Sequence, residues 1–145
     1  MARTLSVFDN AVADAHLWVN EVAGELELDE PRVALQVLRT VLHGLRDRMP
    51  NGVTAHLSAQ LPLLIRGMFF ENWQFREHPV HDRDLTGLFA SVEGVLDEYG
   101  ATVSAQDAVQ AVCDVLGAHV SLGEWRKIGK ILPKELARFW GAPAA

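Results

Sequence analysis

The sequence predicts an all-α fold. Apolar residues recur at three- and four-residue spacings throughout the 145 residues, as expected for helices with one buried face. No segment shows the strict alternation, or the clusters of β-branched and aromatic residues, that indicates a strand. With 49% apolar residues the chain can bury a sizeable core, so we expect about seven helices packed as a single domain over residues 1–145.

The first two predicted helices carry long apolar stripes. The first begins at Ser6, whose hydroxyl can cap the helix, with Asp9 three residues further on. Its predicted core stripe follows a helical spacing and consists of Phe8, Val12, Ala15, Trp18, Val19, Val22 and Leu26. The second helix starts at "LDEPR", where Pro31 is tolerated in the first turn, and runs to about Met49, where "MPNG" ends it.

Proline divides the next segment into two short helices and a linker. A third helix over about 53–60 is ended by Pro62, since proline lacks an amide donor and clashes with the preceding turn. A fourth helix runs from Pro62 to about Phe70. The stretch "NWQFREHPVHDRD" lacks helical periodicity and contains a His–Pro step that favours extended geometry, so residues 73–84 are predicted to form a linker.

Three further helices complete the predicted domain. The fifth covers about 86–99 and is closed by Gly100. The sixth is capped by Ser104 and runs to about residue 120. The seventh begins with a capping box of Ser121 and Glu124 and runs to about residue 140.

The chain reads as two similar halves. An offset of about 71 residues aligns Pro62 with Pro133, half one being residues 6–72 and half two residues 85–141. The aligned apolar pairs include Trp18 with Phe89, Leu38 with Val109, Leu42 with Cys113, Leu61 with Leu132 and Phe69 with Trp140. The apolar face repeats while the polar positions drift, which favours a duplicated packing unit. We therefore expect "AQLPLLIRGMFFENW" and "KILPKELARFW" to be equivalent corners of the core.

Three stretches together resemble a known family. They are "ALQVLRTVLHGLRDRM", "LSAQLPLLIRGMFFENW" and the closing "LPKELARFW", and they are similar to the bacterial family called domain of unknown function 2267 over essentially the whole chain. Members usually have glycine before the tryptophan where this chain has Asn72. The resemblance implies a compact all-α protein of two similar halves, and it implies no activity.

Composition and charge narrow the function classes. The net charge of −6 opposes the electrostatic attraction that nucleic-acid binding requires, so nucleic acid is an unlikely partner. No run approaches the roughly 20 apolar residues of a membrane span, and we expect a cytoplasmic protein without a membrane partner. The segment 124–140 is nevertheless net positive, at +3, and contains all three lysines of the chain, Lys127, Lys130 and Lys134. We expect these to form a solvated helix face.

Candidates for chemistry are few. The linker holds four potential metal ligands within seven residues, namely His78, His81, Asp82 and Asp84. A solvated linker is the favoured interpretation, so we predict no metal and no other cofactor. The single cysteine, Cys113, lies on the apolar face and is interpreted as a small hydrophobic residue. No recognisable catalytic motif occurs, and we expect the protein not to be an enzyme.

The favoured functional hypothesis is a non-enzymatic interaction, structural or regulatory protein that binds another protein or a second copy of itself. Phe70, Trp73 and Phe75 motivate it, because these aromatics have no counterpart in the second half. We expect Trp73 and Phe75 to fold back over the junction between the halves. Two alternatives remain open: a nucleic-acid-binding module that uses the basic C-terminal segment, and a metal-dependent sensor or enzyme centred on His78 and His81.

Overall fold

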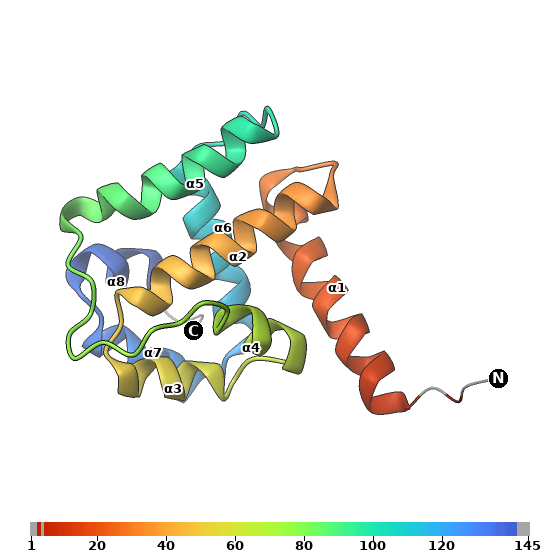
Figure 1. The fold of residues 1–145 in the computed structure, drawn as a ribbon, viewed down its shortest axis with the longest axis horizontal. Coiled ribbons are helices and arrows are strands. Elements are labelled where there is room, and N and C mark those ends of the chain that lie inside the picture. Colours follow the sequence, from red (N-terminus) through yellow and green to blue (C-terminus); the bar gives the residue numbers. More distant parts are fainter. Residues whose placement is uncertain (1–2, 4, 142–145) are drawn as a thin grey trace.

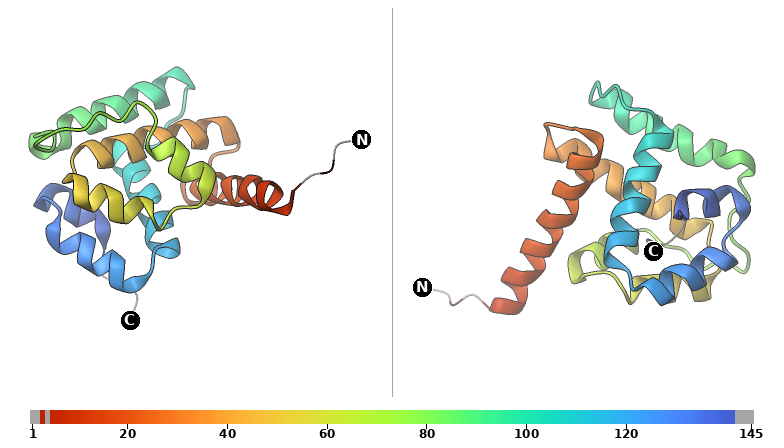
Figure 2. Two further views of the ribbon diagram at one scale, coloured as in Figure 1. Left: turned by 60° about the horizontal axis from the view of Figure 1, so that its bottom comes forward. Right: turned by 180° about the vertical axis from the view of Figure 1, so that it is seen from behind.

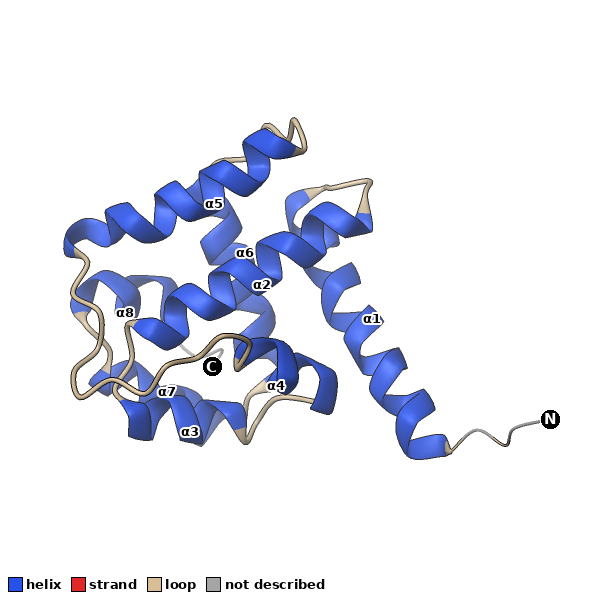
Figure 3. Cartoon of the chain, in the orientation of Figure 1, coloured by secondary structure: helices blue, strands red, loops and turns tan. Residues whose placement is uncertain are grey.

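The computed structural model describes residue 3 and residues 5–141, so both ends of the predicted domain 1–145 lie outside the described residues. Over the described part the chain forms α-helices, one short 3-10 helix and no strand (Figure 3). None of the helices described is long and apolar enough to cross a lipid bilayer. The helices are α1 Ser6–Leu26, α2 Pro31–Asp47, α3 Asn51–Ser58, α4 Leu63–Phe69, η1 Arg83–Leu85, α5 Thr86–Glu98, α6 Ala105–His119, α7 Leu122–Ile131 and α8 Lys134–Trp140.

The predicted all-α class is confirmed, but the described residues form eight α-helices and not about seven. The predicted seventh helix is two helices, because Leu132 is extended (φ −63°, ψ 148°) and Pro133 follows it. Proline cannot donate an amide hydrogen bond to the preceding turn, so α7 ends and α8 starts afresh. The same break separates α3 from α4 at Pro62, where the sequence interpretation did place it.

The predicted caps are correct at one helix, partly correct at a second and wrong at a third. The Ser104 hydroxyl accepts a hydrogen bond from the Asp107 amide at 3.0 Å and starts α6 as expected. Ser121 caps α7 through the Glu124 amide, but its own amide donates to the Gln60 side chain, so the reciprocal half of the capping box is absent. Ser6 is not a cap: it is the first residue inside α1, and the capping position is Leu5, without a side-chain bond.

Helices α2 and α6 cross at the centre of the molecule and supply much of its core (Figure 1). Both pack against α1 and α5, while α4 packs on α2, α8 packs on α6, and α3 lies against α7. Gly44 allows the close approach of α5 to α2, because a β-carbon at this position would collide with Leu88. Leu61 and Leu132 are both buried, as predicted for the two Leu-Pro corners.

Helix α1 buries a stripe along its C-terminal half, whereas Ala11 is the only residue buried in its N-terminal half. Trp18 and Val22 lie in the core, whereas Phe8 and Val12 are 59% and 49% exposed. The prediction that Phe8 and Val12 belong to the core stripe is therefore wrong. The reason is length: at about 1.5 Å per residue, a helix of 21 residues spans about 30 Å and extends past the helices that cover its other end. The projection is visible in each view (Figures 1 and 2).

Candidate interaction surfaces

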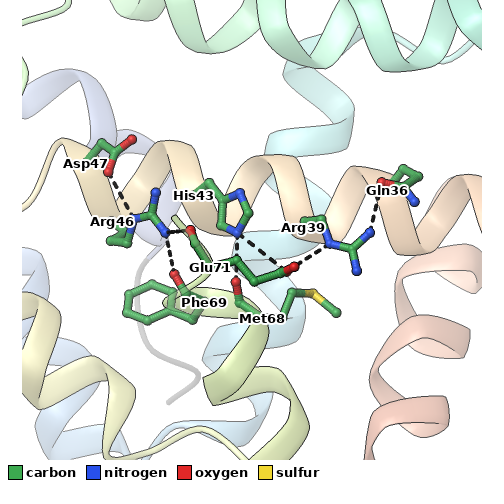
Figure 4. A network of polar contacts seen from close by, with 8 residues as sticks. All are labelled: Gln36, Arg39, His43, Arg46, Asp47, Met68, Phe69 and Glu71. Atoms are coloured by element: carbon green, nitrogen blue, oxygen red, sulfur yellow. Dashed lines mark hydrogen bonds and ion pairs between the residues drawn. The ribbon is translucent and has the colours of Figure 1, made fainter. Parts of the chain in front are cut away.

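A row of two arginines and one histidine on α2 faces the C-terminal end of α4. Arg39, His43 and Arg46 follow each other at helical spacing and lie along one side of the helix (Figure 4). Arg46 is only 4% exposed. Its Nη1 donates to the carbonyls of Phe69 at 2.8 Å and Glu71 at 2.6 Å, and its Nε donates to the Asp47 carboxylate at 2.9 Å.

These contacts stabilise the end of α4. The last carbonyls of a helix have no partner within the helix. A cation placed there also interacts favourably with the negative end of the helix dipole. Arg46 binds one such carbonyl, that of Phe69, and also the carbonyl of Glu71 just beyond the helix. His43 places its Nε2 at 2.7 Å from the carbonyl of Met68, where the ring nitrogen acts as donor. Arg39 adds an outer ion pair with Glu71 at 3.0 Å. The row therefore acts as a structural clamp between α2 and α4.

Sequence reasoning missed this clamp. The signal was present as hydrogen-bond donors at Arg39, His43 and Arg46, a spacing that keeps all three on one helix face next to apolar residues. Nothing in the spacing says that the face meets the end of another helix. That contact depends on how α4 folds back onto α2.

A groove of about 370 Å³ lies beside the clamp, between α2 and α5. Its charged groups are engaged with each other: Arg48 donates to the Asp82 carboxylate at 2.6 and 3.0 Å, and Asp47 pairs with Arg46 and with Arg76. Ser91 donates to a backbone carbonyl of its own helix. The groove is lined by Thr40, His43, Gly44, Asp47, Arg48, Val80, Leu88 and Ser91. Its polar groups serve the fold, and we assign no chemistry to it.

Asp82 has a structural role in the linker. Its carboxylate accepts hydrogen bonds from the amides of Gly87 and Leu88, both at 3.0 Å, and thereby holds the start of α5. Burial by itself would raise the pKa of Asp82, but the hydrogen bonds from Gly87, Arg48 and Leu88 outweigh burial, so the pKa lies below its ordinary value. A residue that sequence reasoning considered as a metal ligand therefore anchors a helix.

The other three metal candidates, His78, His81 and Asp84, are exposed to solvent. Among the residues that the structure describes, no three histidine, cysteine or acidic side chains come together as a metal site would require. Cys113 is fully buried, and burial raises the pKa of its thiol, followed by a smaller effect of the Asp114 charge. A protonated thiol in the core is the small hydrophobic residue that the sequence predicts.

The aromatic candidates form a ladder from the core to the surface. Phe69, Phe70, Trp73 and Phe75 follow one another edge to face, with ring centroids 5.3, 5.6 and 6.3 Å apart. Phe70 and Trp73 are half-buried, but Phe75 is 75% exposed. The expectation that Phe75 folds back over the junction is wrong, since it contacts Trp73 and leaves most of its ring in solvent.

A second groove lies between α7 and α8, with Arg126 and Lys130 among its lining residues. Lys127, Lys130 and Lys134 are exposed, and Lys127 lies 3.7 Å from the Glu124 carboxylate. The α7–α8 groove has a volume of about 250 Å³ and is lined by Trp125, Arg126, Gly129, Lys130, Ala137, Trp140 and Gly141. The two tryptophan rings stack at 3.9 Å, and each indole N–H donates to the other residue's carbonyl, at 2.8 and 3.0 Å.

The start of α1 exposes several large apolar side chains. Leu5, Phe8 and Val12 lie on one side of the helix and are all exposed, and we call these three residues the α1 apolar face. Val7 and Leu17 are also exposed on α1, as are Leu63 and Leu64 on the neighbouring α4. Contiguous apolar surface of this kind is typical of a docking site.

The fold and these surfaces define a small all-α protein with an exposed apolar helix end at one side and a basic groove at the other. The chain belongs to the family described as "Uncharacterized conserved protein (DUF2267)", whose model matches residues 15–139. This match confirms the resemblance in the sequence, and the α1 apolar face precedes the matched residues. A search of curated proteins gave no match.

Proposed function

We propose that this protein is a non-enzymatic interaction protein and that its docking element is the N-terminal half of α1. The α1 apolar face carries this proposal. Leu5, Phe8 and Val12 stand at positions i, i+3 and i+7, the spacing at which an amphipathic helix presents anchors to the groove of a partner.

The energetics of the exposed helix end support a partner. Fully burying a leucine, phenylalanine or valine side chain stabilises a protein by roughly 1.5–3 kcal/mol, and here three such residues are still about half exposed. The first turns of α1 also begin without a side-chain cap. Docking would bury the apolar side chains and hold these turns in place.

We also propose that the chain arose by duplication, and the comparison of the two halves indicates which part of α1 is additional. Helices α2, α3 and α4 recur as α6, α7 and α8 at an offset of about 71 residues. In the outer helices the buried residues Trp18, Val22 and Leu26 match Leu88, Val92 and Leu96, one residue short of that offset. The counterpart of Trp18 is then Leu88, and not Phe89 as the sequence alignment suggested.

On this alignment α1 is longer than its counterpart. Helix α5 begins at Thr86, which aligns with residue 16, and has 13 residues, whereas α1 has 21 and starts at Ser6, nearly three turns earlier. The additional turns carry Phe8 and Val12. They are therefore outside the repeated packing unit, which favours a role in binding over a role in the core.

Photo-cross-linking tests the proposal, with a photo-reactive phenylalanine analogue placed at position 8 of the full chain in the cells that produce this protein. We expect cross-linked products of discrete mass after illumination, because Phe8 would lie in an interface. The same analogue at Tyr99, an exposed aromatic at the end of α5, is the matched control and should give little product. If position 8 yields no adduct, or the same adducts as position 99, the proposal is refuted.

A further inference from the structure

We infer that the partner is a second copy of this chain, such that the α1 apolar face of one molecule occupies the α7–α8 groove of the other. This inference rests on the proposed function. It identifies the occupant from the charge, the chemistry and the position of the two surfaces.

Charge complementarity is the first argument. Helix α1 contains four acidic residues, Asp9, Asp14, Glu21 and Glu25, and neither lysine nor arginine. The segment 124–140 contains five cations against two glutamates. Asp9 is four residues from Leu5 and three from Val12, so it borders the α1 apolar face. The acidic helix of one copy is therefore attracted electrostatically to the basic groove of another copy.

The chemistry of the groove is the second argument. Its floor is formed by the stacked rings of Trp125 and Trp140, whose indole N–H groups are already satisfied within the chain. The floor therefore requires no polar partner and suits an apolar side chain such as Phe8. Gly129 allows α7 to pack closely against the Trp140 ring, since a β-carbon there would lie 3.0 Å from it. On the rim, Arg126 and Lys130 are one helical turn apart and can pair with a carboxylate beside the apolar anchor.

The position of the two surfaces is the third argument. The N-terminal half of α1 projects from one side of the molecule, while α7 and α8 lie on the other (Figures 1 and 2). A chain therefore cannot place its own α1 in its own groove. Two molecules side by side in opposite directions bring each α1 to the groove of the other. This arrangement is closed and two-fold symmetric, and it doubles the buried surface that a single helix end would contribute.

Light scattering and sedimentation of the full chain over a range of concentrations test the inference. We expect a dimer that dissociates on dilution. Asp9→Lys should weaken dimerisation about tenfold, and the double variant Arg126→Glu, Lys130→Glu should weaken it to a similar extent. Combining the three substitutions should restore dimerisation toward the wild-type level, because the charges are exchanged and the attraction is kept. An effect on folding alone would not produce this rescue.

Phe8→Ser and Phe75→Ser form a matched pair, since both phenylalanines are exposed and neither is in the core. We expect Phe8→Ser to abolish the dimer and Phe75→Ser to leave it intact, with circular dichroism melting curves confirming that both variants fold. A monomeric wild type, a dimer that survives Phe8→Ser, equal loss with Phe75→Ser, or no rescue by the charge exchange would each overturn the inference. If the protein is monomeric but position 8 cross-links to a different protein, the inference fails while the proposed function stands.

Discussion

Replacing Arg46 with methionine should strongly destabilise the fold. Methionine keeps an unbranched apolar stem but removes the guanidinium that binds the carbonyls of Phe69 and Glu71. A buried acceptor left without a donor costs about 1–3 kcal/mol, and the Glu71 carbonyl, being only partly buried, can recover some of this from water. We therefore expect the free energy of unfolding to fall by about 3 kcal/mol, a large part of the 5–15 kcal/mol typical of a domain.

Urea unfolding followed by circular dichroism measures this loss. The m-value, the dependence of the unfolding free energy on urea concentration, should stay unchanged because the variant exposes the same surface area on unfolding. The matched control is Arg39→Met on the same helix face. Arg39 is half-exposed and pairs with the Glu71 side chain, so its loss should cost less than about 1 kcal/mol. If the two variants lose similar amounts, or Arg46→Met loses less than Arg39→Met, Arg46 is not the clamp that holds the end of α4.

Three further predictions concern the same framework. Asp82→Asn should lower the free energy of unfolding by about 1.5–3 kcal/mol at pH 7. Because the folded-state pKa of Asp82 lies below its ordinary 3.8, the stabilisation by its carboxylate is complete above pH 3.8 and is lost as the pH falls through the folded-state pKa. The difference from wild type in chemical denaturation should therefore shrink in acid, and a difference that does not change with pH would contradict this. Leu61→Ala and Leu132→Ala should each cost about 2–5 kcal/mol, since both side chains are buried, and unchanged melting temperatures would disprove their equivalence as core corners. Gly44→Ala should destabilise the protein by about 1–3 kcal/mol, because the new β-carbon would collide with Leu88. Gly94→Ala should stabilise it by about 0.5–1 kcal/mol, because a β-carbon there meets no neighbouring atom. Equal effects on the melting temperature would argue against close packing at position 44.

The sequence alone predicted the fold class and most helix positions correctly. Apolar residues at helical spacing and the turns at Pro31, Pro62 and Gly100 are local features, and local chain stereochemistry is enough to begin or end a helix. Gly100 has a φ of +67°, which suits glycine directly after α5. The missed break at Pro133 was equally local, and the rule that located the break at Pro62 would have found it.

The tertiary structure decided which faces are used. The apolar stripe of α1 looks uniform in the sequence, yet Val22 is buried and Phe8 is exposed, because burial depends on whether another helix lies opposite. Asp82 resembled a metal ligand until Arg48 and the start of α5 were found to bind its carboxylate. The role of Arg46 follows from the packing of α4, whose last carbonyl accepts a hydrogen bond from its guanidinium. Periodicity shows that a helix has an apolar side, but only the packing of distant segments determines what that side contacts and what remains for a partner.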